Sequence, residues 1–231
     1  MGLFDKKYCC ICGDKIGLLG NRKLEDGDMC KNCAARLSPW FKERKQSTKA
    51  DIEAQLAYRE ANWQEVQRFH VTDTFGNNQM VFVDVDAKKI IVSGKRNFAD
   101  ENPDVIDCRQ IVDVGMDISE REQELTFRGP DGKQVPYNPQ QFSYTYNFNF
   151  VIYVDHPFIH EMRFQLCKMV TVSPSQADLR RLQSAHDVQR NSHINAFIQR
   201  GMKMDPRKED DYCRAEDECN ALFDLLENLR R

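Results

Sequence analysis

Apolar and polar positions alternate most regularly between residues 142 and 154, in the middle of the chain. A period of two is the spacing of side chains on one face of a strand, so this run predicts a strand with one buried face. The residues on the expected buried face are Phe142, Tyr144, Tyr146, Phe148, Phe150, Ile152 and Val154. We expect it to be core rather than a platform on which nucleic-acid bases stack.

Shorter apolar runs predict the remaining strands. The runs 80–85 and 89–94 flank Asp86-Ala87-Lys88 and are typical of a hairpin. The Gly-Pro-Asp-Gly sequence at 129–132 is a strong turn signal. Further strands are expected over 105–118, 124–128 and 160–167.

Three stretches have helical spacing. Thr48 with Asp51 three residues later resembles a capping box, which predicts a helix over 47–69. A second helix is expected over 176–200, and a third after Pro206, which suits a first helical turn. The apolar stripe of the first helix is expected to consist of Ile52, Leu56, Trp63 and Val66.

The N-terminal segment contains two cysteine pairs with metal-ligand spacing. Cys9-x2-Cys12 and Cys30-x2-Cys33 are separated by 17 residues, which is the spacing of four-cysteine zinc sites. Two residues between sulfurs let one tight turn direct both at the same ion, and two such turns complete a tetrahedron. A segment of about 35 residues buries too little apolar surface to fold alone, so a structural Zn²⁺ would supply the missing stability.

Other readings of these cysteines stay open. Cys10 would replace Cys9 as a ligand only with a poorer fit to the turn, because one residue then separates it from Cys12. Free thiols, a reducible disulfide and a redox pair are further alternatives. A catalytic zinc site is disfavoured, because four sulfur ligands leave no position for water.

Composition indicates a cytoplasmic protein. The 231 residues include nine cysteines, an odd number, and the N-terminus has no apolar stretch long enough for a signal peptide. No run approaches the roughly 20 apolar residues that span a bilayer. In a reducing compartment, clustered cysteines are metal ligands more often than disulfides.

The net charge of −3 is unevenly distributed. Residues 1–69 carry 13 Lys and Arg against 10 Asp and Glu, whereas residues 70–172 carry 10 against 15. The basic N-terminal zone makes nucleic acid an alternative partner, and the acidic middle disfavours an anionic membrane. The residues expected to contact nucleic acid or a partner are Arg22, Lys23, Trp40, Lys42, Arg44 and Lys45.

The stretch YCCICGDKIGLLGNRKLEDGDMCKNCAARLSPWFKERKQST, followed by IEAQLAYREAN, resembles an uncharacterised bacterial zinc-ribbon family, a domain of unknown function. The resemblance covers roughly residues 8–62. It implies that Cys9, Cys12, Cys30 and Cys33 are the ligands and that Cys10 occupies a variable position. It implies no activity.

Strands over 80–167 followed by a helix resemble the bacterial pleckstrin-homology or GRAM-like domains, in which two nearly orthogonal sheets are capped by a helix. Such domains bind lipids in some cases and proteins in others. The basic residues at 88, 89, 95 and 96 would suit a phosphate, although a solvated hairpin is the favoured reading. The fold class expected is therefore α+β, with these parts: a zinc ribbon at 1–46, a connecting helix at 47–70, a pleckstrin-homology-like antiparallel β domain with its terminal helix at 71–200, and a C-terminal helix at 201–231.

No P-loop, Rossmann fingerprint, nucleophile elbow or His-Glu-x-x-His helix occurs in the sequence. His156 and His160 are four residues apart, but Pro157 disfavours the helix that such a metal pair needs. We therefore expect a non-enzymatic adaptor or interaction protein with an unidentified protein partner. Nucleic-acid binding through the ribbon and lipid binding through the pleckstrin-like domain are the alternatives.

Overall fold

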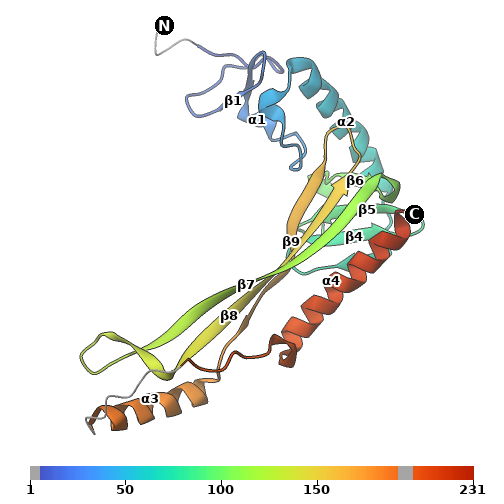
Figure 1. Cartoon of the computed structure of the whole chain (residues 1–231). Coiled ribbons are helices and arrows are strands. Elements are labelled where there is room, and N and C mark those ends of the chain that lie inside the picture. Colours follow the sequence, from blue (N-terminus) through green and yellow to red (C-terminus); the bar gives the residue numbers. More distant parts are fainter. Residues whose placement is uncertain (1–5, 192–199) are drawn as a thin grey trace.

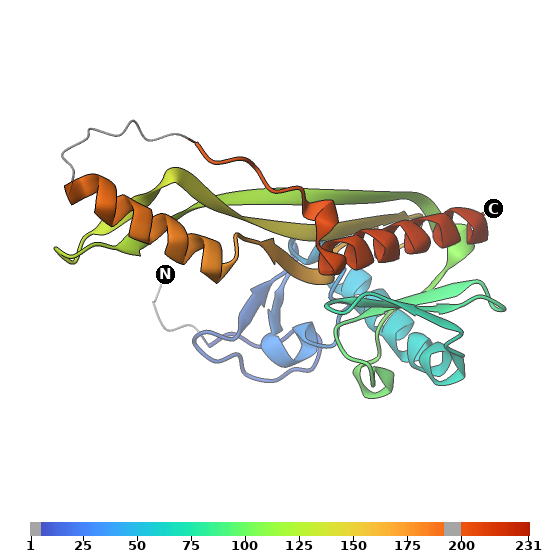
Figure 2. The same cartoon turned by 90° about the horizontal axis from the view of Figure 1, so that it is seen from below.

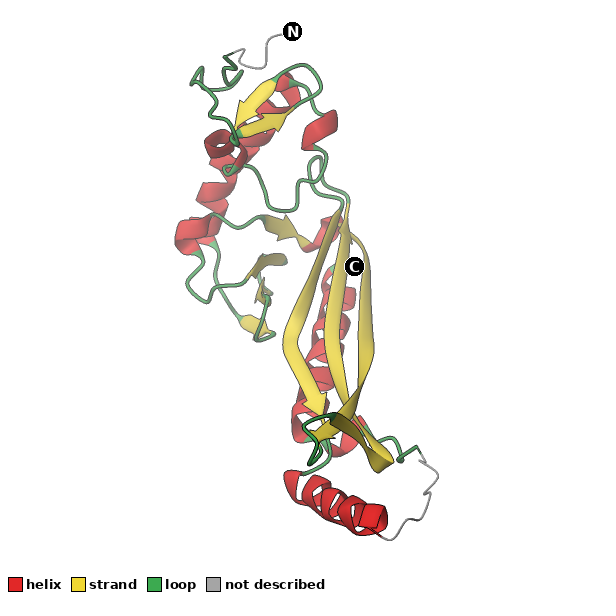
Figure 3. Ribbon diagram, turned by 90° about the vertical axis from the view of Figure 1, so that its left-hand side faces the viewer, coloured by secondary structure: helices red, strands yellow, loops and turns green. Residues whose placement is uncertain are grey.

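The computed structural model describes residues 6–191 and 200–231. The molecule is elongated: the cysteine-rich segment lies at one end, and a long three-stranded sheet runs to the other (Figure 1). The view turned about the vertical axis gives the same order, with a helix beside the far tip of that sheet (Figure 3).

The cysteine-rich segment is a short hairpin followed by one helical turn. Strands β1 (Asn21–Lys23) and β2 (Asp28–Cys30) pair antiparallel. Helix α1 (Lys31–Ala34) follows β2 without a break. A 3-10 turn (Arg44–Gln46) then leads into the long helix α2 (Lys49–Arg68).

The predicted start of α2 is confirmed. The Thr48 hydroxyl accepts a hydrogen bond from the Asp51 backbone N–H at 3.3 Å, and the Asp51 carboxylate accepts one from the Thr48 N–H at 2.8 Å. This reciprocal capping box satisfies two backbone donors that the first turn of a helix would otherwise leave unpaired.

The buried face of α2 differs from the predicted stripe. Trp63 is 38% exposed, although Ile52, Leu56 and Val66 are buried as expected. Polar residues take the remaining buried positions: Gln55, Arg59 and Asn62. The reason is that Arg59 and Asn62 face the loop at 102–104 and donate hydrogen bonds to it, whereas the Gln55 amide is buried without a hydrogen-bond partner.

The two larger sheets and the helices that follow them are called the β domain below. The first of these sheets has four antiparallel strands in the order β3-β4-β5-β6. Strands β4 (Met80–Asp84) and β5 (Lys89–Ser93) form the predicted hairpin, with Met80 opposite Ser93 and Asp84 opposite Lys89. Strand β3 (Asp73–Phe75) pairs with β4, and strand β6 (Val105–Asp107) pairs with β5. A 3-10 turn (Ala99–Glu101) lies in the connection from β5 to β6.

The second sheet has the order β7-β8-β9 and is antiparallel throughout. Its strands are β7 (Ile111–Arg128), β8 (Gln134–Val154) and β9 (Glu161–Val172). The strand predicted at 142–154 is the inner half of β8. The predicted turn closes the β7–β8 hairpin, where the Gly129 N–H donates to the Lys133 carbonyl at 2.8 Å.

Two predicted strand boundaries were wrong. The run 105–118 is divided between β6, a 3-10 turn (Cys108–Gln110) and the beginning of β7. The separate strand expected at 124–128 is the outer end of the same β7. The division arises at Asp107, whose carboxylate accepts from the Arg109 N–H at 2.9 Å and so ends β6 in a capped turn.

The main core lies between the two sheets and the last helix, α4 (Asp210–Leu229). Six residues of α4 belong to this core: Tyr212, Ala215, Cys219, Leu222, Leu226 and Leu229. The buried aromatic residues of β8, such as Phe148 at 0% exposure, face the same core. The expectation that this aromatic face is core is therefore confirmed.

The helix that caps the sheets is not the one expected. The resemblance to pleckstrin-homology domains predicts a capping helix over 176–200, but α3 (Gln176–Asn191) lies along the outer end of the second sheet, and α4 covers the core (Figure 2). Leu179 and Leu182 of α3 contact Phe127 and Tyr137 in a small separate cluster. Residues 192–199 of the predicted helix lie outside the described residues.

Within residues 6–191 and 200–231, none of the helices combines the length and the apolar character that crossing a membrane requires.

Candidate metal centre

Four cysteine sulfurs meet in the N-terminal segment. The Sγ atoms of Cys9, Cys12, Cys30 and Cys33 all lie within 4.8 Å of one another. Three of these side chains are buried and Cys12 is exposed. Each cysteine offers one sulfur, so the group could hold a single metal ion with four ligands.

The backbone of the first pair is wound around its sulfurs. The Gly13 N–H donates to the Cys9 carbonyl at 2.8 Å, and the Cys9 N–H donates to the Asp14 carbonyl at 2.8 Å. Gly13 has φ of +79°, a left-handed conformation that glycine adopts without steric cost. The Cys10 N–H donates to the Asp28 carbonyl at 2.9 Å and ties this turn to the hairpin that carries the second pair.

The second pair lies where β2 meets α1. Cys30 ends the strand and caps the helix, because its sulfur accepts a hydrogen bond from the Cys33 N–H at 3.4 Å. This contact fixes the direction of the Cys30 sulfur, which lies within 4.8 Å of the other three. The local fold therefore prepares this sulfur to act as a ligand.

The electrostatics of the four sulfurs are those of a site that needs a cation. Burial raises the pKa of Cys9, but hydrogen bonds from the backbone at Cys12 and Cys30 outweigh it, so the pKa of Cys9 falls to about 6. Burial and hydrogen bonds to its sulfur neighbours raise the pKa of Cys33 above its usual range. Four thiolates this close together would repel one another, so a metal ion is needed to hold all four sulfurs deprotonated.

Cys10 is not part of the cluster. Its side chain is half-buried, and its sulfur lies beside Gly27, 3.3 Å from the position that a Cβ would take there. The structure therefore places the sulfur of Cys9, and not that of Cys10, beside the sulfurs of Cys12, Cys30 and Cys33. In the described part of the chain no other cluster of three or more potential metal ligands occurs.

The core beneath the cysteines is small and shared with α2. It combines four cysteine-segment side chains with the first half of the helix: Ile16, Leu24, Met29 and Leu37 with Ile52 and Leu56. The cysteines Cys9, Cys30 and Cys33 complete the same cluster. This cluster is separate from the main core but touches it, because the Phe41 and Phe158 ring centroids lie 6.3 Å apart.

The six residues expected to contact nucleic acid or a partner lie in different surroundings. Trp40 contacts Phe164 of β9, with ring centroids 6.2 Å apart, and Lys42 forms an ion pair with Glu161 at 3.2 Å. Arg44 donates to the backbone carbonyl of Lys23 at 2.6 Å. Arg22 donates to the carbonyl of Leu19, whereas Lys45 is exposed. Several of these side chains therefore hold the molecule together, and nucleic-acid binding stays a prediction.

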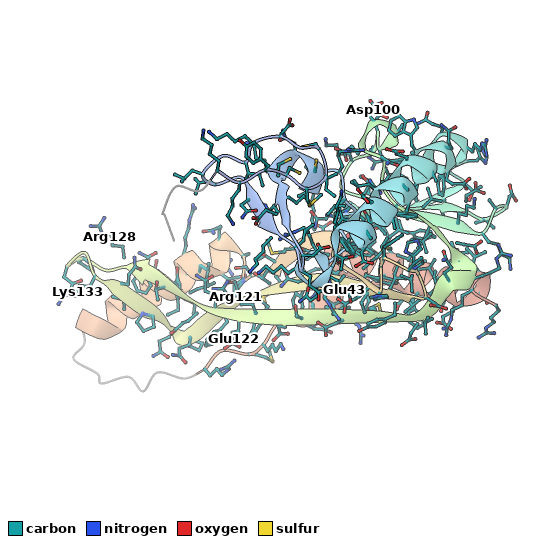
Figure 4. The ribbon with its side chains drawn as sticks, turned by 90° about the horizontal axis from the view of Figure 1, so that it is seen from above. Glu43, Asp100, Arg121, Glu122, Arg128 and Lys133 are labelled. Atoms are coloured by element: carbon teal, nitrogen blue, oxygen red, sulfur yellow. The ribbon has the colours of Figure 1, made fainter. Side chains whose placement is uncertain are left out.

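The other candidates are dispersed. His156 is buried against Tyr58, whereas His160 is exposed and lies 3.7 Å from Glu43. Glu43 lies close to the long sheet, while Arg128 and Lys133 mark the sheet's outer tip (Figure 4). In the basic hairpin, Lys89 pairs with Glu65 and Lys95 pairs with Glu101.

Sequence reasoning missed a buried polar junction centred on Asp104. Its carboxylate accepts hydrogen bonds from the Ser38 hydroxyl at 2.7 Å, the Tyr58 hydroxyl at 3.2 Å and the Arg59 guanidinium at 2.7 Å. Asn62 donates to the Pro103 carbonyl at 2.8 Å. These contacts join the cysteine segment, α2 and the loop before β6 in one network.

A signal for this junction was present in the helix. Arg59 and Asn62 are three residues apart, which places them on one face of α2; Gln55, four residues before Arg59, lies on the same face but makes no hydrogen bond to the junction. Polar residues on one helix face indicate a buried network only when the residues that they contact are known. Here those residues, Pro103 and Asp104, lie more than 40 positions further along the sequence.

The sequence model of a family described as "Domain of unknown function (DUF4428)" matches residues 7–55. The matched part contains all four clustered cysteines and the beginning of α2. Searches of curated proteins and of solved structures found no match to the chain. The predicted resemblance of the N-terminal segment to a family of unknown function is therefore confirmed.

Proposed function

We propose that the N-terminal segment is a structural zinc ribbon, with Cys9, Cys12, Cys30 and Cys33 as its ligands. The observation that carries the proposal is the meeting of their four sulfurs within 4.8 Å. Four thiolates suit the tetrahedral coordination of Zn²⁺, and they fill it without leaving a position for water or substrate. The ion would therefore stabilise the fold rather than perform chemistry.

The protein as a whole would act as a non-enzymatic adaptor. Support comes from the Asp104 junction, where Arg59 of α2 and Ser38 of the ribbon bond to one buried carboxylate. A junction of this kind fixes the orientation of two units, and a fixed orientation is useful to a protein that brings two partners together.

The second unit of the adaptor would be a pleckstrin-homology-like domain. In support, a four-stranded antiparallel sheet is followed by a three-stranded one and then by α4, which contributes to the core between them. The long β7–β8 extension and α3 would then be additions to that plan.

Metal analysis of the purified chain tests the ribbon. We expect one equivalent of zinc by elemental analysis in the wild type, a strong loss for Cys9→Ser, and an unchanged content for Cys10→Ser. Cys10 is the matched control because it neighbours Cys9 but lies outside the sulfur cluster. Equal zinc loss in both variants, or a wild type without zinc, would contradict the proposal.

Affinity capture tests the adaptor role. The full-length chain and an Asp104→Asn variant, which loosens the junction, would be compared as bait with identical metal content. We expect the wild type alone to hold a ribbon-bound and a β-domain-bound partner in one complex. Turnover of a substrate that depends on a single polar residue would overturn the non-enzymatic assignment.

A further inference from the structure

Two adjacent leucines protrude fully from the ribbon. Leu18 and Leu19 are 95% and 90% exposed. They are the two central residues of a tight turn, because the Gly20 N–H donates to the Gly17 carbonyl at 2.9 Å. Arg22 braces the turn by donating to the Leu19 carbonyl at 3.3 Å.

Leucine is unusual at this position. The central residues of a tight turn point into solvent and are commonly glycine, proline, asparagine, aspartate or serine, each of which favours the turn conformation. Leucine offers no such advantage, and here neither side chain contributes to the ribbon core. The pair therefore adds nothing visible to the folding of the ribbon, which points to a role in contact with something outside the molecule.

Two lysines lie beside the leucine turn. Lys15 and Lys31 are exposed and line, together with Leu18 and Leu19, a concavity of about 490 Å³ beside the turn. Asp14 also lines this concavity, and its negative charge partly offsets the two lysines. The nearby Asp28 is already offset, because Lys7 forms an ion pair with it at 3.1 Å.

Aromatic and electrostatic features extend the same surface. Tyr8, which is 57% exposed, pairs with Lys15 through an isolated β-bridge. Residues 6–46 carry ten Lys and Arg against five Asp and Glu. Even with a zinc–thiolate centre of charge −2, this end of the molecule would stay positive, in contrast to the acidic β domain.

We propose that the Leu18–Leu19 turn inserts into the surface of a membrane that contains anionic lipids. A convex apolar tip with cations at its base suits a bilayer, because the leucines reach the acyl boundary while lysine and arginine stay at the level of the phosphates. The concavity beside Lys15 and Lys31 lies where a headgroup would be met. A protein partner would instead need a complementary pocket for the tip.

The shape of the molecule permits this contact. The ribbon and the outer tip of the long sheet lie at opposite ends (Figures 1 and 3). Charges separated by more than a Debye length, about 8–10 Å at physiological ionic strength, are largely screened from one another. Carboxylates on the outer part of the sheet therefore do not prevent the ribbon from approaching an anionic surface, and Glu120 and Glu122 are in any case paired with Lys203 and Arg200.

Vesicle co-sedimentation of the full-length, zinc-loaded protein tests the proposal. We expect binding to vesicles of phosphatidylcholine with 30% phosphatidylserine. Binding to phosphatidylcholine alone should be weaker by about tenfold or more, given the usual energies of apolar insertion and of cations near an anionic surface. Two double variants should each reduce the binding about tenfold or more: Leu18→Ser combined with Leu19→Ser, and Lys15→Glu combined with Lys31→Glu.

The control is a second pair of exposed apolar residues. Met169 and Met202 are 62% and 95% exposed and lie outside the ribbon, so Met169→Ser with Met202→Ser should leave binding unchanged. Binding that ignores lipid charge, that survives the leucine substitutions, or that is absent altogether would overturn the membrane proposal.

The membrane proposal rests on the zinc-ribbon proposal, because it requires a folded ribbon. Measuring the zinc content distinguishes failure of one proposal from failure of the other. A wild type that holds one equivalent of zinc but ignores both kinds of vesicle would refute membrane insertion and leave the ribbon standing. A leucine variant that binds a protein in place of lipid, or a concentration-dependent dimer lost on the same substitution, would assign the turn to a protein partner and also refute the proposal.

Discussion

Asp104 illustrates how one residue can fix the relation between distant parts of a chain. Its side chain is fully buried, and its charge is balanced by Arg59 at 2.7 Å. Removing one partner of a buried ion pair leaves the other charged and without compensation, which usually costs about 3–5 kcal/mol. The surrounding hydroxyl donors would also lose a charged acceptor.

Asp104→Asn should therefore lower the free energy of unfolding by about 3 kcal/mol, measured by urea denaturation. Asp100→Asn is the matched control, because Asp100 is exposed and points outward in the same loop region (Figure 4). We expect the control to change the free energy by less than about 0.5 kcal/mol. Equal effects of the two substitutions would show that the Asp104 network does not contribute to stability.

At the residue scale, local signals were readable and distant ones were not. The Thr48–Asp51 capping box and the sulfur grouping follow from spacings of a few residues, so the sequence alone places them. The partner of Arg59 lies 45 residues further along the chain. No local pattern predicts such a contact, which is why Trp63 was expected on a buried face that polar residues occupy instead.

At the scale of elements, predictability followed the regularity of burial. The inner half of β8 alternates because one face meets the core and the other does not. The outer part of β7 has no such contrast, since Glu120, Glu122 and Glu124 lie among residues that are mostly exposed on both faces. The pattern predicts both helices after the strands, but the first of them does not cap the sheets: α3 lies beside the outer end of the long β7–β8 extension, and α4 packs on the core.

A matched pair of Leu→Ala substitutions tests these different roles of α3 and α4. Leu222 is 0% exposed in the main core, whereas Leu179 is 8% exposed in the small cluster at the outer end of the sheet. Leu222→Ala should cost about 3 kcal/mol of global stability. Leu179→Ala should lower protection against hydrogen exchange near Phe127 and Tyr137 alone. A global loss from Leu179→Ala comparable with that from Leu222→Ala would mean that both helices belong to one core.

At the scale of the whole molecule, α2 joins the ribbon core to a small cluster on the first sheet, and both are separate from the main core. Ile52 and Leu56 belong to the ribbon core, whereas Val66 at the other end of the helix belongs to a cluster with β4 and β5. Stability is distributed in such cooperative units, and a unit with few apolar contacts opens more readily than its neighbours. A structural zinc ion would supply on the order of 10 kcal/mol to the ribbon and nothing directly to the β domain.

Removal of zinc with a strong chelator should therefore unfold one end of the molecule and spare the other. Hydrogen exchange should accelerate across the β1–β2 hairpin and the first half of α2, because Ile52 and Leu56 lose the surface against which they are buried. The amides of β8 should stay protected, since Phe148 and Ile152 face a core that contains no ribbon side chain apart from the partly buried Trp40. Cys12→Ser should reproduce the pattern without chelator. If chelation instead exposed β8 as fast as β1, the ribbon and the β domain would form one cooperative unit, and the Asp104 junction would transmit unfolding between them rather than merely orient them.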